Sequence, residues 1–101
     1  MDRVNLDQFG MIKSRIITVI NESGIKLPEL EELTGISRYT WSNLKNPAKS
    51  REIKEEEITA IGKVFPEYRW WVLTGEEMPE VGQISPMTKA AQKELGIQRK
   101  A

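Results

Sequence analysis

The hydrophobic positions of the chain recur at helical spacing. From about Leu6 to Asn21 they repeat at three- and four-residue steps, which predicts an amphipathic helix whose apolar face packs in a core. The positions on this face are Leu6, Phe9, Ile12, Ile16, Val19 and Ile20. The predicted end signals are the capping pair Asn5 and Gln8 and the stop at Gly24. Lys13 and Arg15 fall outside the apolar face.

The stretch from Leu27 to Asn46 predicts two short helices joined by a tight turn at Gly35-Ile36-Ser37. Leu30 and Leu33 are one turn apart, so they share a face of the first helix, and Pro28 suits its first turn. Gly35 ends this helix, because glycine adopts the left-handed conformation at no steric cost. Ile36 is then expected to enter the core between the two helices.

The second of these helices is predicted to begin at a Ser37 cap and to end before Pro47. Trp41 and Leu44 follow at helical spacing and would bury its inner face. Its outer face then carries Arg38, Tyr39, Ser42, Asn43 and Lys45. Long donors and small amides on one exposed face suit contact with base edges in the major groove of DNA.

Two further helices are predicted toward the middle of the chain. The first covers roughly Lys54 to Val64, with Ile58, Ile61 and Phe65 as its apolar face and carboxylates in its first turn. The second runs from Glu67 to Leu73, begins after Pro66 and is closed by Gly75. Because Trp70 and Trp71 are adjacent, at least one must point away from the core. An exposed tryptophan is then covered by the chain's tail or by a second subunit.

The pattern changes after Gly75. Residues 76–85 contain Pro79 and Gly82 without a helical period, which predicts an extended connector with Met78, Val81 and Ile84 on the surface. A last short helix from Pro86 to Leu95 is predicted between a Ser85 cap and a Gly96 stop. Three alternatives are open for this helix: it docks on a partner, it frays, or it binds DNA. The residues that would contact DNA are Lys89, Lys93, Arg99 and Lys100. No strand is predicted, so the fold class is all-α.

Composition removes several classes of function. The 101 residues suit one domain with a tail, and the chain has no cysteine and no histidine. Disulfide frameworks, Cys/His metal sites and histidine-based acid–base catalysis are therefore excluded. No Gly-rich phosphate loop, dinucleotide fingerprint or nucleophile context is present, so we expect neither an enzyme nor a cofactor. No apolar run approaches the roughly 20 residues that cross a bilayer, and we expect a cytoplasmic protein.

The charges balance, with 15 basic and 15 acidic residues. Nucleic-acid-binding domains are often basic, but a small reader of the major groove needs only a basic face. The acidic residues cluster at Glu29, Glu31, Glu32, at Glu52, Glu55, Glu56, Glu57, and at Glu76, Glu77, Glu80. The basic residues of the middle region are Lys45, Lys49, Arg51 and Lys54. We expect weak non-specific affinity and a specificity that depends on base contacts.

The Leu27–Asn46 stretch resembles the helix-turn-helix of the phage lambda-type repressor and Cro family, the XRE-like regulators. The matching residues are Leu30, Gly35, Ile36, Ser37, Trp41 and Leu44. Trp41 stands where the family usually has Val or Ile, and Thr34 stands where an apolar residue is common. Glu31 stands where the family usually has a small Ala, because the two helices cross closely there. Its side chain fits only if the helices splay or its stem turns outward.

The resemblance implies a compact five-helix DNA-binding domain over residues 1–75 and a C-terminal extension over residues 76–101. It places Arg38, Tyr39 and Asn43 on base-reading positions, where Arg suits guanine and Asn suits adenine. The residues expected at phosphates are Ser37, Ser42, Lys45, Lys49 and Arg51. Lys49, Ser50 and Arg51 belong to the loop that follows the reading helix in this family; the alternative is a solvated loop. Metal ions have no predicted role.

In the resembled family the region after the fourth helix often builds the dimer, which makes Trp70 and Trp71 the expected interface; packing inside one subunit is the alternative. The function implied is a sequence-specific transcriptional regulator, a repressor of phage or prophage type, that binds a pseudo-palindromic operator as a homodimer. A second hypothesis is an antitoxin-like or adaptor protein whose main partner is another protein. A third is an accessory factor of phage excision or replication.

Overall fold

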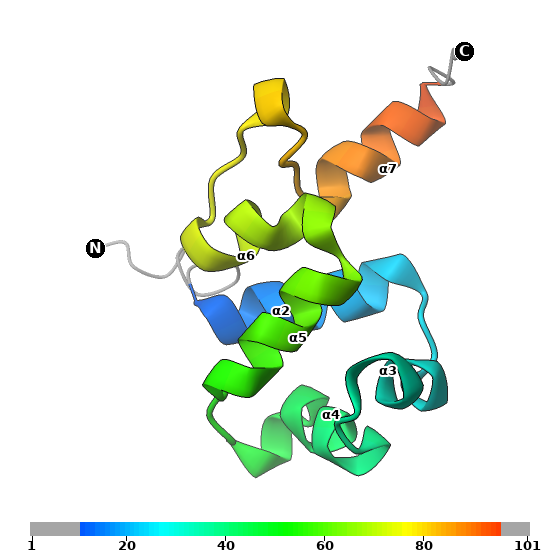
Figure 1. Ribbon diagram of the computed structural model, residues 1–101, viewed down its shortest axis with the longest axis vertical. Helices are drawn as coiled ribbons and strands as arrows, with labels where there is room; N and C mark the ends of the chain where they lie inside the picture. Colours follow the sequence, from blue (N-terminus) through cyan, green and yellow to red (C-terminus); the bar gives the residue numbers. More distant parts are fainter. Residues whose placement is uncertain (1–10, 96–101) are drawn as a thin grey trace.

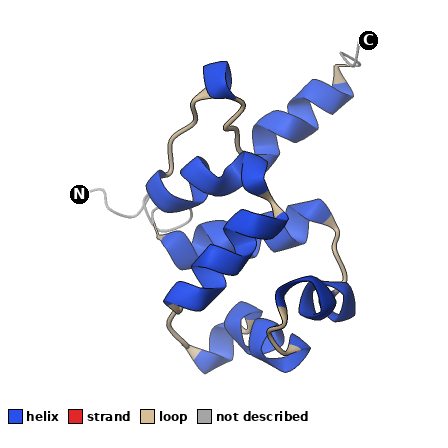
Figure 2. Cartoon of the chain, viewed as in Figure 1, coloured by secondary structure: helices blue, strands red, loops and turns tan. Residues whose placement is uncertain are grey.

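The computed structural model describes residues 11–95, and this part of the chain consists of helices and loops without a strand (Figure 2). The α-helices are α2 (Ile12–Ser23), α3 (Leu27–Thr34), α4 (Arg38–Lys45), α5 (Glu55–Val64), α6 (Arg69–Thr74) and α7 (Pro86–Glu94). Short 3-10 turns are η1 (Pro47–Lys49), η2 (Pro66–Tyr68) and η3 (Pro79–Val81). The predicted all-α fold class is confirmed.

Helix α2 lies at the centre of the molecule, with α5 crossing it, α3 and α4 on one side and α6 on the other (Figure 1). The apolar face predicted for the first helix is buried as expected, since Ile16, Val19 and Ile20 are at most 1% exposed. The core is completed by Leu30, Trp41, Leu44, Ile61, Tyr68, Trp71 and Val72. One core therefore joins helices α2 to α6.

Helix α2 begins at Ile12, six residues after the predicted start at Leu6, because Met11 before it has an extended backbone with φ −120° and ψ 147°. Leu6, Phe9 and the capping pair Asn5 and Gln8 lie outside the described residues. Within them, α2 continues two residues past the predicted end to Ser23, and Gly24 follows with a left-handed φ of 75°. This glycine supports the predicted stop signal.

Arg15 corrects the expectation that it lies outside the packed face of α2. It is only 5% exposed, its Nε donates to the carbonyl of Val72 at 2.8 Å, and its Nη2 donates to Leu73 at 3.4 Å. These carbonyls lie in the last turn of α6, where backbone acceptors lack partners within the helix and the helix dipole favours a cation. The guanidinium therefore joins α2 to the end of α6.

The helix predicted from Glu67 to Leu73 begins instead as a 3-10 turn, η2, and becomes α-helical only from Arg69 to Thr74. The amide of Tyr68 donates to the carbonyl of Phe65, which is the three-residue step of a 3-10 turn. Gly75 closes α6 with a φ of 81°, as predicted. The adjacent tryptophans separate as expected: Trp71 is 4% exposed and belongs to the core, whereas Trp70 is 39% exposed.

Residues 76–85 are not the extended connector that their composition predicts. Met78 and Gln83 form an antiparallel bridge around η3, with backbone N–O distances of 2.8 and 3.1 Å. The Gln83 side chain accepts from the amide of Trp70 at 2.7 Å and donates to the carbonyl of Pro66 at 2.9 Å. A backbone amide left free at the start of α6 thus gains its partner from a segment later in the sequence.

Helix α7 begins as predicted, with the Ser85 hydroxyl accepting from the amide of Thr88 at 3.2 Å. Figure 1 shows α7 projecting away from the body of the molecule. Near its start, Lys89 contacts Glu67 at 3.1 Å and lies 5.8 Å from the centre of the Tyr68 ring. The hydrogen bond from Lys89 to Glu67 raises the pKa of Lys89. Arg99, Lys100 and the predicted Gly96 stop lie outside the described residues.

Candidate nucleic-acid interface

Helices α3 and α4 are joined by the tight turn that the sequence predicts. Helix α3 ends at Gly35, whose φ of 75° is left-handed. The Ser37 side chain accepts a hydrogen bond from the amide of Tyr39 at 3.1 Å and so caps α4. Ile36 is partly buried against the core, and Leu33 is 57% exposed although Leu30 is fully buried. The one-turn spacing of these leucines therefore places only Leu30 in the core.

The Thr34 hydroxyl holds the turn together. It donates to the carbonyl of Leu30 at 2.7 Å and accepts from the amide of Ile36 at 3.1 Å. It also lies 3.4 Å from the indole Nε1 of Trp41, which donates to it. Because the Trp41 side chain is fully buried, its polar N–H needs a partner inside the protein, and Thr34 supplies it.

Helix α4 separates its side chains into a buried and an exposed set. Trp41 and Leu44 are 0% and 1% exposed, which confirms the predicted inner face. The opposite side exposes Arg38, Tyr39, Ser42 and Asn43, with Lys45 partly exposed. Tyr39 is 72% exposed. The structure thus brings the three sequence-predicted base-reading residues together on one accessible surface.

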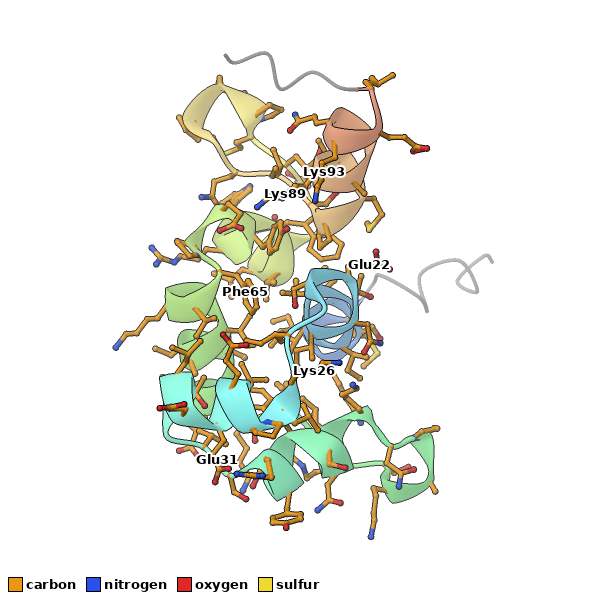
Figure 3. The ribbon with its side chains drawn as sticks, turned by 90° about the vertical axis from the view of Figure 1, so that its right-hand side faces the viewer. Glu22, Lys26, Glu31, Phe65, Lys89 and Lys93 are labelled. Atoms are coloured by element: carbon orange, nitrogen blue, oxygen red, sulfur yellow. The ribbon has the colours of Figure 1, made fainter. Side chains whose placement is uncertain are left out.

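Arg38 forms an ion pair that the sequence reasoning missed. Its Nε lies 2.6 Å from Oε1 of Glu31 on α3, and the two side chains are 46% and 35% exposed. Figure 3 shows Glu31 where α3 adjoins α4. The stem of Glu31 turns outward rather than between the helices, as expected for a long side chain at a close crossing. The signal available in the sequence was a carboxylate seven residues before an arginine, across a tight turn.

The loop after α4 carries the candidate phosphate contacts Lys49 and Ser50, both exposed. The Asn46 side chain accepts from the amide of Ala48 at 2.9 Å and starts η1. Ser50 then has a left-handed φ of 47°, which turns the chain toward α5. Hydrogen bonding at Asn46 therefore fixes the direction in which this loop leaves α4.

Arg51 has a different place from the other candidate phosphate contacts. Its Nη2 and Nη1 lie 2.9 and 3.3 Å from the two carboxylate oxygens of Glu57, which is fully buried at the start of α5. Its Nη2 also donates to the carbonyl of Thr40 in α4 at 3.3 Å. Lys13 donates to the backbone carbonyl of Arg51. The guanidinium therefore links α4 to α5, and the phosphate contact expected of Arg51 stays a prediction.

A second exposed surface lies on α6 and α5. Trp70 and Leu73 of α6 are 39% and 46% exposed, and an apolar groove between the two helices is lined by Ile58, Val72 and Leu73, among others. Trp71 is 4% exposed and Trp70 is 39% exposed, so Trp70 offers the larger surface to a partner. The assignment of both residues to a dimer interface stays a prediction.

The predicted basic residues of α7 are only partly free. Lys89 and Lys93 line a hollow together with Glu22 and Phe65 (Figure 3), and Lys89 is paired with Glu67. No group of acidic side chains in residues 11–95 is arranged to hold a metal ion. Nor does any helix in this part of the chain have the length and apolar character needed to cross a membrane.

The fold and this surface together define a small all-helical domain that presents one short, capped helix to solvent. A comparison with solved structures finds the same architecture in Pf6r from the filamentous phage Pf6 of Pseudomonas aeruginosa PA01. The two chains are 36% identical with a TM-score of 0.67, and the match covers 75% of this chain and 95% of Pf6r. The chain belongs to the family of Pf6r. No protein-family model and no curated protein matches it.

Proposed function

We propose that the protein is a sequence-specific DNA-binding regulator of phage type, and that α3, the turn and α4 form an XRE-like helix-turn-helix. In this proposal α4 enters the major groove and the protein represses transcription by occupying an operator. The kinship with a phage protein supports the phage setting. The observation that carries the proposal is the separation of side chains on α4.

That separation gives α4 what a reading helix needs. Trp41 anchors the helix from inside, so its outer donors are held on a fixed backbone. Arg38 can form two hydrogen bonds with the acceptors of guanine, and Asn43 can do the same with adenine. Tyr39 adds a hydroxyl and an apolar ring beside thymine methyl groups.

Backbone contacts to DNA are assigned to residues around the helix. The hydroxyls of Ser37 and Ser42 and the ammonium groups of Lys45 and Lys49 are the donors proposed for phosphates. Arg51 has a different role in this proposal, because its ion pair with Glu57 holds the loop between α4 and α5 in place. We therefore assign the salt-dependent part of binding mainly to the two lysines.

A homodimer through the Trp70 surface completes the proposal. Two copies related by a two-fold axis would place their α4 helices about 34 Å apart and match a pseudo-palindromic operator. Trp70 is exposed on the helix whose residues Val72 and Leu73 line an apolar groove, and exposed apolar surface of this kind is what a second subunit covers.

The same surface favours a second candidate function, an antitoxin-like or adaptor protein whose main partner is another protein. The exposed Trp70 and Leu73 support it, as does the zero net charge of the chain. A gel shift on the DNA upstream of the protein's own gene separates the two candidates. Binding by the purified protein alone favours the regulator, whereas binding only with a partner present favours the adaptor.

Selection of binding sites from random DNA tests the main proposal, because it yields the operator and its symmetry together. We expect a pseudo-palindrome. In the selected duplex, Arg38→Ala should remove discrimination at one base pair per half-site, worth roughly 1–3 kcal/mol. Lys49→Ala should weaken all sequences alike and flatten the salt dependence. Equal, sequence-independent effects of the two changes would show that the roles are assigned wrongly.

A further inference from the structure

The contact between Glu31 and Arg38 joins α3 to α4, the two helices of the candidate nucleic-acid interface. Glu31 lies on α3, and Arg38 is the first residue of α4. We propose that Glu31 is a specificity-determining residue, which orients Arg38 toward guanine and disfavours DNA that lacks guanine at that position. The inference rests on the proposed function, since it assigns a role within the same DNA-reading surface.

The atoms involved in the contact leave the reading end of Arg38 available. Glu31 accepts from the Nε of Arg38 at 2.6 Å, on the side of the guanidinium nearest the main chain. The terminal nitrogens Nη1 and Nη2 make no other hydrogen bond within residues 11–95. These two nitrogens form a fork that matches the O6 and N7 acceptors of guanine. A carboxylate at Nε therefore fixes the plane of the fork without competing for it.

Orientation matters because an arginine side chain is otherwise flexible. A free arginine at the start of α4 could turn away from the base and bond to a neighbouring phosphate, which would strengthen binding to any sequence. A guanidinium held at Nε loses part of this freedom before DNA arrives, so less conformational entropy is lost when it meets guanine. Glu31 thus favours base contact over phosphate contact.

The negative charge of Glu31 acts in the same direction. It lies on α3, which also exposes Glu29 and Glu32 and contacts the start of α4 through Glu31. Like charges repel, so these carboxylates lower the affinity for DNA in general. At a site with guanine the contacts of Arg38 offset that repulsion, and at other sites nothing does.

A purely stabilising role for the pair is disfavoured by its exposure. The Arg38 and Glu31 side chains are 46% and 35% exposed, and ion pairs at such positions add little to the free energy of unfolding. The pair contrasts in this respect with Arg51 and the fully buried Glu57. Changing Glu31 should therefore alter DNA recognition without unfolding the domain.

Glu32→Gln provides a matched control for Glu31→Gln. Glu32 is the next residue of α3, is exposed, and makes no ion pair within the described residues. Both changes remove one negative charge from the same helix, but only Glu31→Gln alters the contact with Arg38. A difference between the two variants then reports orientation rather than charge.

The test begins with site selection from random DNA for the wild-type chain, followed by Kd measurements on two duplexes. One duplex is the selected site, and the other replaces the guanine whose preference disappears in Arg38→Ala. We expect the wild-type protein to prefer the guanine duplex by about ten-fold or more. Glu31→Gln should reduce this preference to about two- to three-fold and bind the replaced duplex more tightly than wild type. Glu32→Gln should tighten both duplexes alike and keep the preference.

Three results would overturn the inference. The first is a guanine preference in Glu31→Gln equal to that in Glu32→Gln, with wild-type site selection intact; this leaves the proposed function standing. The second is a sharper preference in Glu31→Gln than in wild type, which would mean that the carboxylate withholds Arg38 from guanine. The third is a wild-type protein that selects no sequence, which removes the proposed function and this inference together.

Discussion

At the scale of single residues, the turn between α3 and α4 explains two departures from the resembled family at once. A tryptophan stands where a small aliphatic residue is usual, and a threonine stands where an apolar residue is common. In the structure the buried indole of Trp41 donates to the Thr34 hydroxyl, which also binds the backbone at Leu30 and Ile36. The threonine hydroxyl therefore supplies the acceptor that the buried indole N–H needs.

Replacing Thr34 by valine should destabilise the domain by about 1–2 kcal/mol. The change keeps the shape of the side chain but leaves the indole N–H of Trp41 and the amide of Ile36 without their acceptor. Urea unfolding monitored by circular dichroism measures the loss. Thr34→Ser keeps the hydroxyl and should lose markedly less; equal losses in the two variants would show that the hydrogen bonds contribute nothing.

At the scale of elements, local signals in the sequence located most of the helices. The bounds predicted for α3, α4 and α5 agree with the structure to within a residue, because Gly35, Ser37 and Pro47 act on the backbone beside them. Local signals did not predict contacts between elements that are distant in the sequence. The bonds from Arg15 to α6, from Arg51 to Glu57 and from Gln83 to η2 all needed the tertiary arrangement.

The candidate site follows the same division. The exposed face of α4 was predictable, since the period of a helix decides which side chains share a side. The ion pair between Glu31 and Arg38 was not predicted, and neither was the ion pair between Arg51 and Glu57, because both depend on how neighbouring elements pack. A basic residue in a polar loop has the same sequence signature whether it faces solvent or a buried carboxylate.

Arg51→Met should destabilise the domain by about 3 kcal/mol, because it leaves the buried carboxylate of Glu57 without its counter-charge. For a chain of this size that corresponds to a fall in Tm of roughly 12–24 °C. Scanning calorimetry measures the change. Lys49→Met, an exposed cation two residues earlier, is the control and should leave Tm nearly unchanged. A small effect of Arg51→Met would mean that the guanidinium is not a link between α4 and α5.

The start of α7 should be sensitive to acid through Glu77. Its carboxylate accepts from the Thr88 hydroxyl at 2.5 Å and from the Ser85 amide at 2.7 Å, and these bonds, that of Thr88 foremost, lower the pKa of Glu77 below its ordinary 4.5. A folded-state pKa below the unfolded value gives stability that is complete above about pH 4.5 and is lost as the pH falls through the lower value.

We therefore expect the amide resonances of Ser85 and Thr88 to move together when NMR spectra are recorded below pH 4.5. In Glu77→Gln this acid transition should vanish, whereas Glu76→Gln, a change at an exposed neighbour, should preserve it. Unchanged Ser85 and Thr88 resonances in acidified wild-type protein would show that the carboxylate does not hold the start of α7.

At the scale of the whole molecule, the two exposed surfaces lie on different helices. One is the outer face of α4, and the other is the part of α6 that carries Trp70 and Leu73, above α2 and α5 in Figure 1. The two adjacent tryptophans thus lie in different environments, since Trp71 is part of the core and Trp70 is exposed. In the proposed homodimer, pairing through α6 would therefore leave α4 accessible.

Trp70→Lys should convert the proposed homodimer into a monomer, because a charge replaces an exposed ring of the proposed interface. Sedimentation velocity measures the mass, and binding to the selected operator should weaken by about ten-fold or more as the two half-sites lose their linkage. Val81→Lys places the same charge at another exposed apolar position and should leave the mass unchanged. If the mass of Trp70→Lys equals that of wild type, the dimer surface lies elsewhere.

The different burial of the three tryptophans has a practical consequence for fluorescence measurements. Trp41 and Trp71 are shielded from solvent, whereas the indole of Trp70 is accessible. A neutral quencher such as acrylamide should therefore reduce the fluorescence of essentially one emitter, and the remaining blue-shifted emission reports on the interior. Quenching that disappears as the protein is concentrated would signal self-association, and the same cuvette would register the loss of core packing as a red shift.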